Sequence, residues 1–380
     1  MRFNTPLRYP GGKGKLANFM LRLIEENNLS PIHYAEPYAG GAGLALKLLH
    51  LNAAEKIILN DINISVYAFW HSVLNHADQL CSLIERTEVT MDEWFRQKDI
   101  INNPKDHDLL TIGFSTFFLN RTNRSGILKG GVIGGKNQEG KWKLDARYNK
   151  SDLISRIHKI SENRHRIDLY NMDAIDFIKK IVIQLPQNSL TYLDPPYYIK
   201  GKGLYINHYN HDDHVRVAKV VQNNIKTPWI VSYDNTPEIQ AMYKTSSLVY
   251  GINYSAQDRY KGSEVMFFSE RLKIFKTDDP TKVKAPVFKR GCVDDHIQTY
   301  KEPQKIRRIK WLVLIVLFQL IIKIRTRVQL PPAPPLALPD TSGEILKARM
   351  AQALRAFLCL PLSEDIQLNP VIIGIRLGIR

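Results

Sequence analysis

The chain has 380 residues, of which 44% are hydrophobic, and this is enough for one large core or for a core with a smaller module. Its formal net charge of +16 suits a polyanionic partner, either nucleic acid or an acidic membrane surface, although general solubility would also explain it. Cys81, Cys292 and Cys359 form no CxxC pair, so we expect no disulfide framework and no metal site, and a cytoplasmic location. The N-terminal stretch MRFNTPLRYPGG has no apolar h-region, so we expect no signal peptide.

The first segment with a clear turn pattern is RYPGGKGK, Arg8 to Lys15, a glycine corner that precedes a predicted helix. Its aromatic residue Tyr9, its tight turn and Lys13 suit the carboxylate-bearing tail of a cofactor. A plain N-terminal turn would explain the same residues nearly as well.

Residues 33–61 are predicted to form a strand (HYAEP), a glycine turn (YAGGAG), a helix (LALKLLHL) and a second strand (KIILND). Gly40, Gly41 and Gly43 let the backbone approach a ligand closely, and the first N–H groups of the helix then face that ligand. The spacing is not GxGxxG and no GK[ST] follows, which argues against a P-loop. Asp61 ends the second strand, where doubly wound folds bind a ribose diol, although it could instead cap the next helix.

Residues 65–164 interrupt this rhythm, and we interpret them as an inserted module that begins with helical stretches. In NRTNRSG, Asn120 to Gly126, the Arg and Asn side chains can grip guanine and adenine bidentately, or can hold phosphates. The lysine-rich stretch that follows predicts a basic β-hairpin for a DNA groove or backbone, the alternative being a solvated surface hairpin. The candidate DNA contacts are Asn120, Arg121, Asn123, Arg124, Ser125, Lys129, Lys136, Lys141 and Arg147.

The alternation resumes with a strand (RIDLYNMD), a helix (AIDFIKKIVI), a strand (SLTYLD), a helix (DHVRVAKVVQNN) and a strand (WIVSY). The segments SLVYGINY and EVMFFS then predict an antiparallel edge. This order predicts an α/β fold with a mostly parallel sheet covered on both faces. Asp173, at the end of the first of these strands, could accept a hydrogen bond from an adenine amino group or could cap the following helix.

The stretch YLDPPY ends a predicted central strand, the place where an open α/β sheet carries its chemistry. Pro195 and Pro196 form a rigid corner without N–H donors, so Asp194 and the Pro195 carbonyl are acceptors that could hold an exocyclic amino group. Tyr197 supplies a flat face on which a flipped base can stack. Fixed acceptors of this kind favour a tetrahedral nitrogen whose lone pair points at an electrophile. A plain Asp-Pro turn is the alternative for the tetrapeptide alone.

The motifs RYPGGK, AEPYAGGAG and DPPY occur in this order in the Dam-like (D12-class) DNA adenine N6-methyltransferases, and the chain resembles that family over roughly residues 3–275. Residues 117–150 also resemble its target-recognition region. The resemblance implies a Rossmann-like methyltransferase sheet, with a catalytic domain of residues 1–64 and 165–275 and a helical plus β-hairpin target-recognition module of residues 65–164. It further implies S-adenosylmethionine as methyl donor and the N6 amino group of adenine in double-stranded DNA as acceptor.

Carried over by motif, Asp194 would lie between the cofactor and the target amino group, in the corner formed with Pro195 and Pro196, and Tyr197 would stack on the flipped base. One departure is Tyr38, which stands where phenylalanine is common in the family. The positions that would contact the cofactor are Tyr9, Lys13, Tyr38, Gly40, Asp61 (ribose hydroxyls), Asp173 (adenine) and Asp194.

The tail of residues 276–380 has no counterpart in the family pattern and is interpreted as a non-catalytic appendage, with a fused or misread coding region as one explanation of its origin. It contains basic runs, the short apolar stretch 311–322 and the proline-rich PPAPPLALP. A spanning helix needs about 20 apolar residues, so 311–322 is too short, and contact with a membrane surface or a partner is the minor alternative.

Two rival functions stay open beside adenine methylation. Cytosine N4 methylation uses the same amino-group chemistry, but those enzymes usually have serine at the position of Asp194. A DNA-binding module without activity is the other. Cytosine C5 methylation is disfavoured, because it needs a cysteine nucleophile and no cysteine here follows a proline or lies in a glycine turn. We expect a role in restriction-modification or genome marking, with a restriction endonuclease as a separate partner, and a loop at 199–205 that orders when DNA and cofactor bind.

Overall fold

The computed structural model describes residues 5–9, 13–199, 209–254 and 260–285, and these contain a seven-stranded sheet in the order β3-β2-β1-β4-β5-β7-β6. Strands β1 to β5 pair in parallel, whereas β7 is antiparallel to both β5 and β6. The predicted α/β fold and its antiparallel edge are therefore confirmed. The strands are β1 (Ile32–Glu36), β2 (Ala54–Asn60), β3 (Ile167–Tyr170), β4 (Ser189–Leu193), β5 (Trp229–Asp234), β6 (Ser247–Tyr254) and β7 (Tyr260–Phe268).

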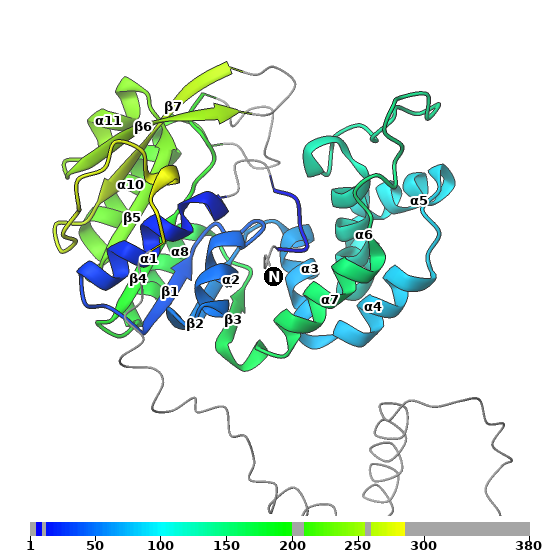
Figure 1. Cartoon of the computed structure of the whole chain (residues 1–380), viewed down its shortest axis with the longest axis horizontal. Coiled ribbons are helices and arrows are strands. Elements are labelled where there is room, and N and C mark those ends of the chain that lie inside the picture. Colours follow the sequence, from blue (N-terminus) through cyan, green and yellow to red (C-terminus); the bar gives the residue numbers. More distant parts are fainter. Residues whose placement is uncertain (1–4, 10–12, 200–208, 255–259, 286–380) are drawn as a thin grey trace, which may run out of the picture. The chain divides into compact units, whose positions relative to one another are not determined.

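Helices cover both faces of this sheet, as the alternation of the buried residues requires (Figure 1). In β2, Ile57 and Leu59 join the core with helices α1 and α2, while Ile58 between them joins the core with α8, α10 and α11. The helices are α1 (Ala17–Glu26), α2 (Gly43–His50), α3 (Ile64–Asn75), α4 (Ala77–Arg86), α5 (Met91–Asn102), α6 (Leu109–Thr122), α7 (Lys150–Ser161), α8 (Ala174–Lys180), α10 (His211–Asn224) and α11 (Pro237–Met242).

The strand order reverses between β1 and β4, which places a switch point at the centre of the sheet. From β1 the chain moves outward to β2 and β3, and from β4 it moves the other way to β5. The loops that leave the carboxyl ends of β1 and β4 therefore diverge, and open sheets of this kind bind ligands in the resulting crevice. Glu36 ends β1 and Asp194 directly follows β4, so the two predicted motifs meet here.

Helices α3 to α7 all lie between β2 and β3 in the chain, and Figure 1 shows them grouped beyond the β3 edge of the sheet. The predicted helices at the start of this segment are present. The predicted β-hairpin is wrong: residues 123–149 form turns and a short 3₁₀ segment, with one isolated bridge between Asn123 and Val132 as their only strand-like pairing.

The glycines that suggested a hairpin turn explain why none forms. Gly134 and Gly135 have positive φ angles of 86° and 79°, which break an extended strand. The side chain of Gln138 then organises the segment as a compact loop, because it donates to the carbonyls of Ile133 and Gly135 and accepts from the N–H of Leu144.

Two earlier expectations fall outside the described residues. The tail from residue 286 onward, including the apolar stretch 311–322, is one of them, and most of the loop 199–205 is the other. Among the residues that the structure does describe, no helix is long and apolar enough to cross a membrane, and no cluster of three or more potential metal ligands occurs.

Helix α6 packs against α3 at Gly113, which is too close to α3 for any side chain. A β-carbon at this position would lie 2.4 Å from the Ser72 hydroxyl and 2.6 Å from the Ala68 carbonyl oxygen. This close approach fixes the position of α6 relative to α3. It thereby also positions the candidate DNA-contacting segment at the end of α6.

Replacing Gly113 by alanine is expected to lower the free energy of unfolding by about 1–2 kcal/mol, because overpacking against backbone outweighs the gain of about 1 kcal/mol in helix propensity. Urea unfolding of the full-length chain measures this. Gly131→Ala is the matched control, since nothing lies within 4 Å of its added β-carbon. Equal stability of the two variants would contradict the packing argument.

Candidate active site

The glycine turn after β1 is shaped by the ring of Tyr9, which lies directly against it. A β-carbon at Gly40 would be 2.7 Å from the Tyr9 ring, and one at Gly41 would be 2.9 Å from the Tyr9 β-carbon. Gly40 also has a positive φ of 45°, and its carbonyl accepts a hydrogen bond of 2.8 Å from the Trp70 indole. Tyr9 and the glycines, predicted to serve one cofactor, therefore form one packed unit.

Asp61 at the end of β2 holds the same turn from the other side. Its carboxylate accepts hydrogen bonds of 2.9 Å from the backbone N–H groups of Gly40 and Asn63. The cap of α3 is Asn63, so the alternative role of Asp61 as the helix cap is not what the structure shows. Burial raises the pKa of Asp61 to about 6, even though both of these hydrogen bonds lower it.

Glu36 is a cavity residue that the sequence reasoning did not single out. It ends β1, is buried, and accepts a hydrogen bond of 3.2 Å from the N–H of Ala45 in the first turn of α2. Burial raises the pKa of Glu36 to about 8, so this carboxyl holds its proton at neutral pH. An acid at the end of a buried strand was the available signal, the same signal that pointed to Asp61.

A cavity of about 960 Å³ joins these residues to the DPPY corner. It is lined by residues from the N-terminal segment, the glycine turn, the ends of β2 and β4, and the helices α1, α2, α6 and α7. The residues most relevant to chemistry are Tyr9, Lys13, Glu36, Tyr38, Gly40, Asp61, Arg121, Arg156, Asp194, Pro196 and Tyr209.

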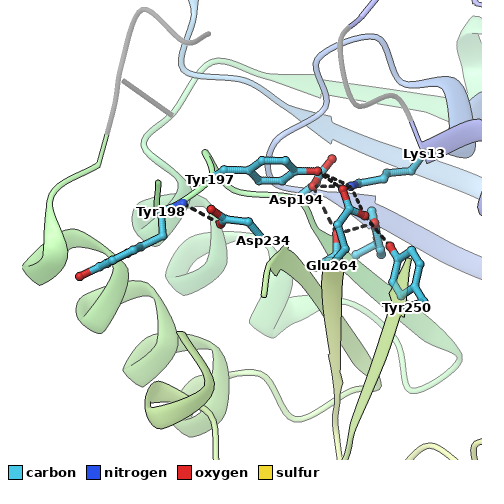
Figure 2. Close-up of polar contacts among 9 residues, drawn as sticks. Lys13, Asp194, Tyr197, Tyr198, Asp234, Tyr250 and Glu264 are labelled. Carbon is cyan, nitrogen blue, oxygen red and sulfur yellow. Dashed lines mark hydrogen bonds and ion pairs between the residues drawn. The ribbon is translucent and has the colours of Figure 1, made fainter. Parts of the chain in front are cut away.

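Asp194 lies at the centre of a polar cluster on the cavity wall (Figure 2). Its Oδ1 atom is 3.4 Å from the Lys13 ammonium and accepts a hydrogen bond of 3.2 Å from the Ser232 hydroxyl. Burial raises the pKa of Asp194 to about 6, Lys13 opposes this rise, and the charge of Glu264 adds to it. Within the described residues no partner engages Oδ2, so this oxygen is available to a ligand.

Lys13 is buried and contacts three groups of this cluster. Its ammonium is 2.8 Å from the Tyr197 hydroxyl and 3.0 Å from each carboxylate oxygen of Glu264. Burial alone would lower the pKa of Lys13, but the carboxylates of Asp194 and Glu264 outweigh it and raise the pKa, so the amine stays charged. The predicted contact of Lys13 with the cofactor stays a prediction.

The DPPY corner is anchored on both sides. The Tyr197 hydroxyl donates to Glu264, and the side chain of Tyr197 is only 4% exposed. Immediately after it, the N–H of Tyr198 donates to the carboxylate of Asp234 at 2.8 Å (Figure 2). The N–H of Ile199 donates to the same carboxylate at 2.9 Å. Asp234 and Glu264 were both missed from the sequence; each is the single acid of its strand.

Tyr38 and Asp173 are the two other residues that were predicted to bind the cofactor, and both form hydrogen bonds within the protein. Tyr38 lines the cavity and its hydroxyl is 3.1 Å from that of Tyr209. Asp173 is exposed and caps α8 by accepting from the N–H groups of Ile175 and Asp176, and it does not belong to the described lining of the cavity. The capping alternative for Asp173 is therefore what the structure shows.

Asn120 and Asn123, predicted to contact DNA, are buried and fully engaged in structural hydrogen bonds. Asn120 accepts from the N–H of Arg8 and donates to its carbonyl, both at 2.7 Å. Asn123 accepts from the Trp94 indole at 2.7 Å and donates to the carbonyls of Ile127 and Leu128. Both side chains therefore have a structural role, and reaching a base would leave these buried partners without hydrogen bonds, so a direct contact of either residue with DNA stays a prediction.

Of the remaining candidate DNA contacts, Arg121 is buried and the others are exposed. Arg121 is 8% exposed and lines the cavity together with Arg8 and Arg156. Burial and the charges of Arg156 and Arg8 lower the pKa of Arg121 to about 9, which still leaves it charged at neutral pH. The exposed candidates are Arg124, Ser125, Lys129, Lys136, Lys141 and Arg147.

The sequence of the chain matches a known protein family over most of the residues that form this site. The model of the family described as D12 class N6 adenine-specific DNA methyltransferase matches residues 9–257, more than half of the chain. The chain belongs to this family. The methyltransferase uses S-adenosylmethionine and acts on adenine in DNA, and the family predicted from its motifs is confirmed. The match includes the glycine turn and the DPPY corner, and it ends before Glu264.

Two solved structures that resemble the methyltransferase share little sequence with it. An rRNA methyltransferase from Streptomyces viridochromogenes has 12% identity and a TM-score of 0.34, with 69% of this chain and 86% of that chain covered. Spermidine synthase from Thermotoga maritima has 10% identity and a TM-score of 0.31, with 70% and 60% covered. These similarities carry no argument about activity. No curated protein sequence matches the chain.

Asn123→Ala is expected to lower the free energy of unfolding by about 2–4 kcal/mol, because it leaves the Trp94 indole and two carbonyls unpaired. Its neighbour Arg124 is exposed, so Arg124→Ala should change stability by no more than about 0.5 kcal/mol. Urea unfolding of both variants tests the assignment. An Asn123→Ala protein as stable as the Arg124→Ala protein would contradict the structural role of Asn123.

Proposed function

We propose that the enzyme methylates the N6 amino group of an adenine flipped out of duplex DNA, with Asp194 as the acceptor for that amino group. One observation carries the proposal. Asp194 follows the central strand β4 and lines the same cavity as the glycine turn and Asp61, with its Oδ2 atom unengaged by any described residue. An acceptor for the nucleophile and the features expected of a cofactor site thus share one cavity.

The chemistry requires such an acceptor. An aromatic amino group is a poor nucleophile, because its lone pair is delocalised into the ring. Accepting its hydrogens at fixed oxygens favours a tetrahedral nitrogen, and acceptors that need not reorganise give the strongest stabilisation of developing positive charge. Asp194 suits this role because burial raises its pKa and so makes the ionised carboxylate a stronger acceptor.

The cavity fits S-adenosylmethionine in its donor and acceptor groups. Gly40 leaves room only for the ring of Tyr9 that packs against it, and Asp61 in the same cavity lining is an acceptor suited to ribose hydroxyls. We assign cofactor binding to the turn, to Asp61 and to Tyr9 and Tyr38 beside them. When bound, S-adenosylmethionine supplies the activated methyl group.

Stacking of the flipped base on Tyr197 forms part of the same proposal. The hydroxyl of Tyr197 is held by Lys13 and Glu264, which fixes the position of the far end of the ring. Because only 4% of this side chain is exposed, a base can stack on it only after its surroundings move, and we assign that movement to DNA binding.

We further propose that Arg121 holds a phosphate of the flipped nucleotide. Its Nε atom is buried and has no hydrogen-bond partner within the described structure, an arrangement that favours a bound anion. Arg8 and Arg156 line the same cavity, although both already donate to backbone carbonyls. Residues 65–164 would then form the target-recognition module, with its exposed basic side chains on the DNA backbone.

Product analysis tests the reaction itself. Duplex DNA incubated with enzyme and S-adenosylmethionine is digested to nucleosides, and N6-methyladenine is expected. N4-methylcytosine in its place would establish the cytosine alternative, and DNA binding without any methylated nucleoside would establish the inactive module. Sequencing of the methylated DNA then gives the site, on which the proposed role in restriction-modification or genome marking depends.

The pH dependence of methyl transfer should follow Asp194. Since the ionised carboxylate is the acceptor, the single-turnover rate is expected to fall as the pH drops through about 6, the raised pKa of this group. A rate that is flat from pH 8 to pH 5 would exclude Asp194 as the titrating acceptor.

Asp194→Asn should abolish transfer yet stabilise the fold. A carboxyl whose pKa is raised on folding destabilises the folded state above that pKa, so its removal is expected to add about 1–2 kcal/mol to the free energy of unfolding at pH 7.5. Asp168→Asn, the same change at a partly exposed acid of β3 outside the cavity lining, is the control and should keep its activity.

Replacing Lys129, Lys136 and Lys141 together by alanine should weaken DNA binding on all sequences alike. Up to three phosphate contacts would be lost, so the negative slope of log K against log salt should become less steep by as much as about 2.7. The control replaces the exposed lysines Lys179, Lys180 and Lys226, which lie outside the insert, and should leave the slope unchanged. Equal slopes for both triple variants would exclude these lysines from DNA binding.

A further inference from the structure

Glu264 is the most deeply buried charged group near Asp194, and its position in the sheet is fixed. It lies on β7, where it pairs with Asp234 of β5 and Tyr250 of β6, and it is 0% exposed. A buried carboxylate is tolerated only when it is paired and hydrogen-bonded. Four contacts meet this condition: Lys13 lies 3.0 Å from each oxygen, and the hydroxyls of Tyr197 and Tyr250 donate to it.

The ammonium of Lys13 is shared unequally between two acids. It is 3.0 Å from both oxygens of Glu264 but 3.4 Å from the nearest oxygen of Asp194, so its charge is directed mainly at Glu264. Asp194 thereby keeps most of its negative character for a ligand. Without Glu264, the same ammonium would have Asp194 as its only described carboxylate partner.

We propose that Glu264 is a positioning residue for methyl transfer, which holds the Lys13 ammonium and the Tyr197 hydroxyl in place and keeps Asp194 a strong acceptor. This rests on the proposed role of Asp194. Glu264 does not touch the reacting atoms in this scheme and acts through its two partners. It also lies outside the span matched to the family, in a strand whose neighbouring residues Val265 to Phe268 are apolar.

The charges in the cluster support this division of roles. Lys13 and the tyrosine hydroxyls outweigh burial and lower the pKa of Glu264, so it is ionised at neutral pH, and Lys13 is charged. Asp194 is the member that titrates near pH 6. The other titratable groups coupled to it are Glu36, which is protonated at neutral pH, and the tyrosines Tyr34 and Tyr192, which burial keeps neutral.

Glu264→Gln removes the charge while keeping the size of the side chain. The charge of Glu264 raises the pKa of Asp194, and its loss also leaves Lys13 to Asp194 alone. Both changes lower the pKa of Asp194 and make it a weaker acceptor. The single-turnover methylation rate should fall by about tenfold or more, and the acid limb of its pH profile should move to lower pH.

Tyr250→Phe is the matched control, because it removes one hydrogen bond to Glu264 without changing any charge. Its acid limb should stay where the wild-type limb lies. A slower Glu264→Gln enzyme whose acid limb also stays there would overturn the proposal, since a purely structural defect slows the reaction without shifting the titration of Asp194. Thermal unfolding and S-adenosylmethionine affinity, measured for each variant, establish that folded enzyme is being compared.

The double variant Lys13→Met with Glu264→Gln keeps the test decisive if Glu264→Gln alone folds poorly. Removing both opposite charges should restore much of the stability lost in either single variant, because neither charge is then left buried and unpaired. In the Lys13→Met background, Glu264→Gln should shift the acid limb less than in wild type, and an equal shift would overturn the route through Lys13. If the wild-type enzyme forms no N6-methyladenine, the proposed function itself is wrong.

Discussion

The buried ammonium of Lys13, held between two carboxylates, is the interaction on which the candidate active site depends. It joins three parts of the chain that are far apart in sequence: the N-terminal corner, the end of β4 and the antiparallel strand β7. A charge in this position is tolerated only with partners on every side, and the two acids and Tyr197 provide them. The cluster therefore forms only when the sheet is complete, so its chemistry is tied to the fold as a whole.

A second constraint couples the glycine turn to the segment at the end of α6. Tyr9 packs on Gly40 and Gly41, and the adjacent residue Arg8 is bound at both its N–H and its carbonyl by Asn120. The β-carbon of any other residue at Gly126 would lie 2.2 Å from the same Arg8 carbonyl. The wall of the cavity is therefore built jointly by the sheet and by the helices between β2 and β3, with Arg8 and Tyr9 between them.

The sequence predicted the sheet well because its strands are short apolar runs that alternate with helices, a pattern determined by burial on both faces. It also identified Asp194 and the glycine turn, whose neighbours in sequence are their neighbours in space. Glu264 could not be predicted, because its meaning depends on Lys13, 251 residues away in the chain. The structural hydrogen bonds of Asn120 and Asn123 could not be predicted for a related reason: the sequence does not show whether an amide side chain faces a base or a buried carbonyl. The hairpin failed because glycines with positive φ support a compact loop as readily as a turn between strands.

The two hydrogen bonds between Asn120 and Arg8 have a consequence for protein engineering. The Asn120 side chain supports the backbone of Arg8 beside the glycine turn. The stretch from Asn120 to Gly126 therefore stabilises the candidate active site, although it lies inside the insert. The hydrogen bonds of the Gln138 side chain, by contrast, stay within residues 133–144. In an exchange of recognition loops between relatives, the exchanged segment should therefore begin after Gly126. This junction keeps the contacts of Asn120 and Gly126 with Arg8 and replaces the exposed basic surface.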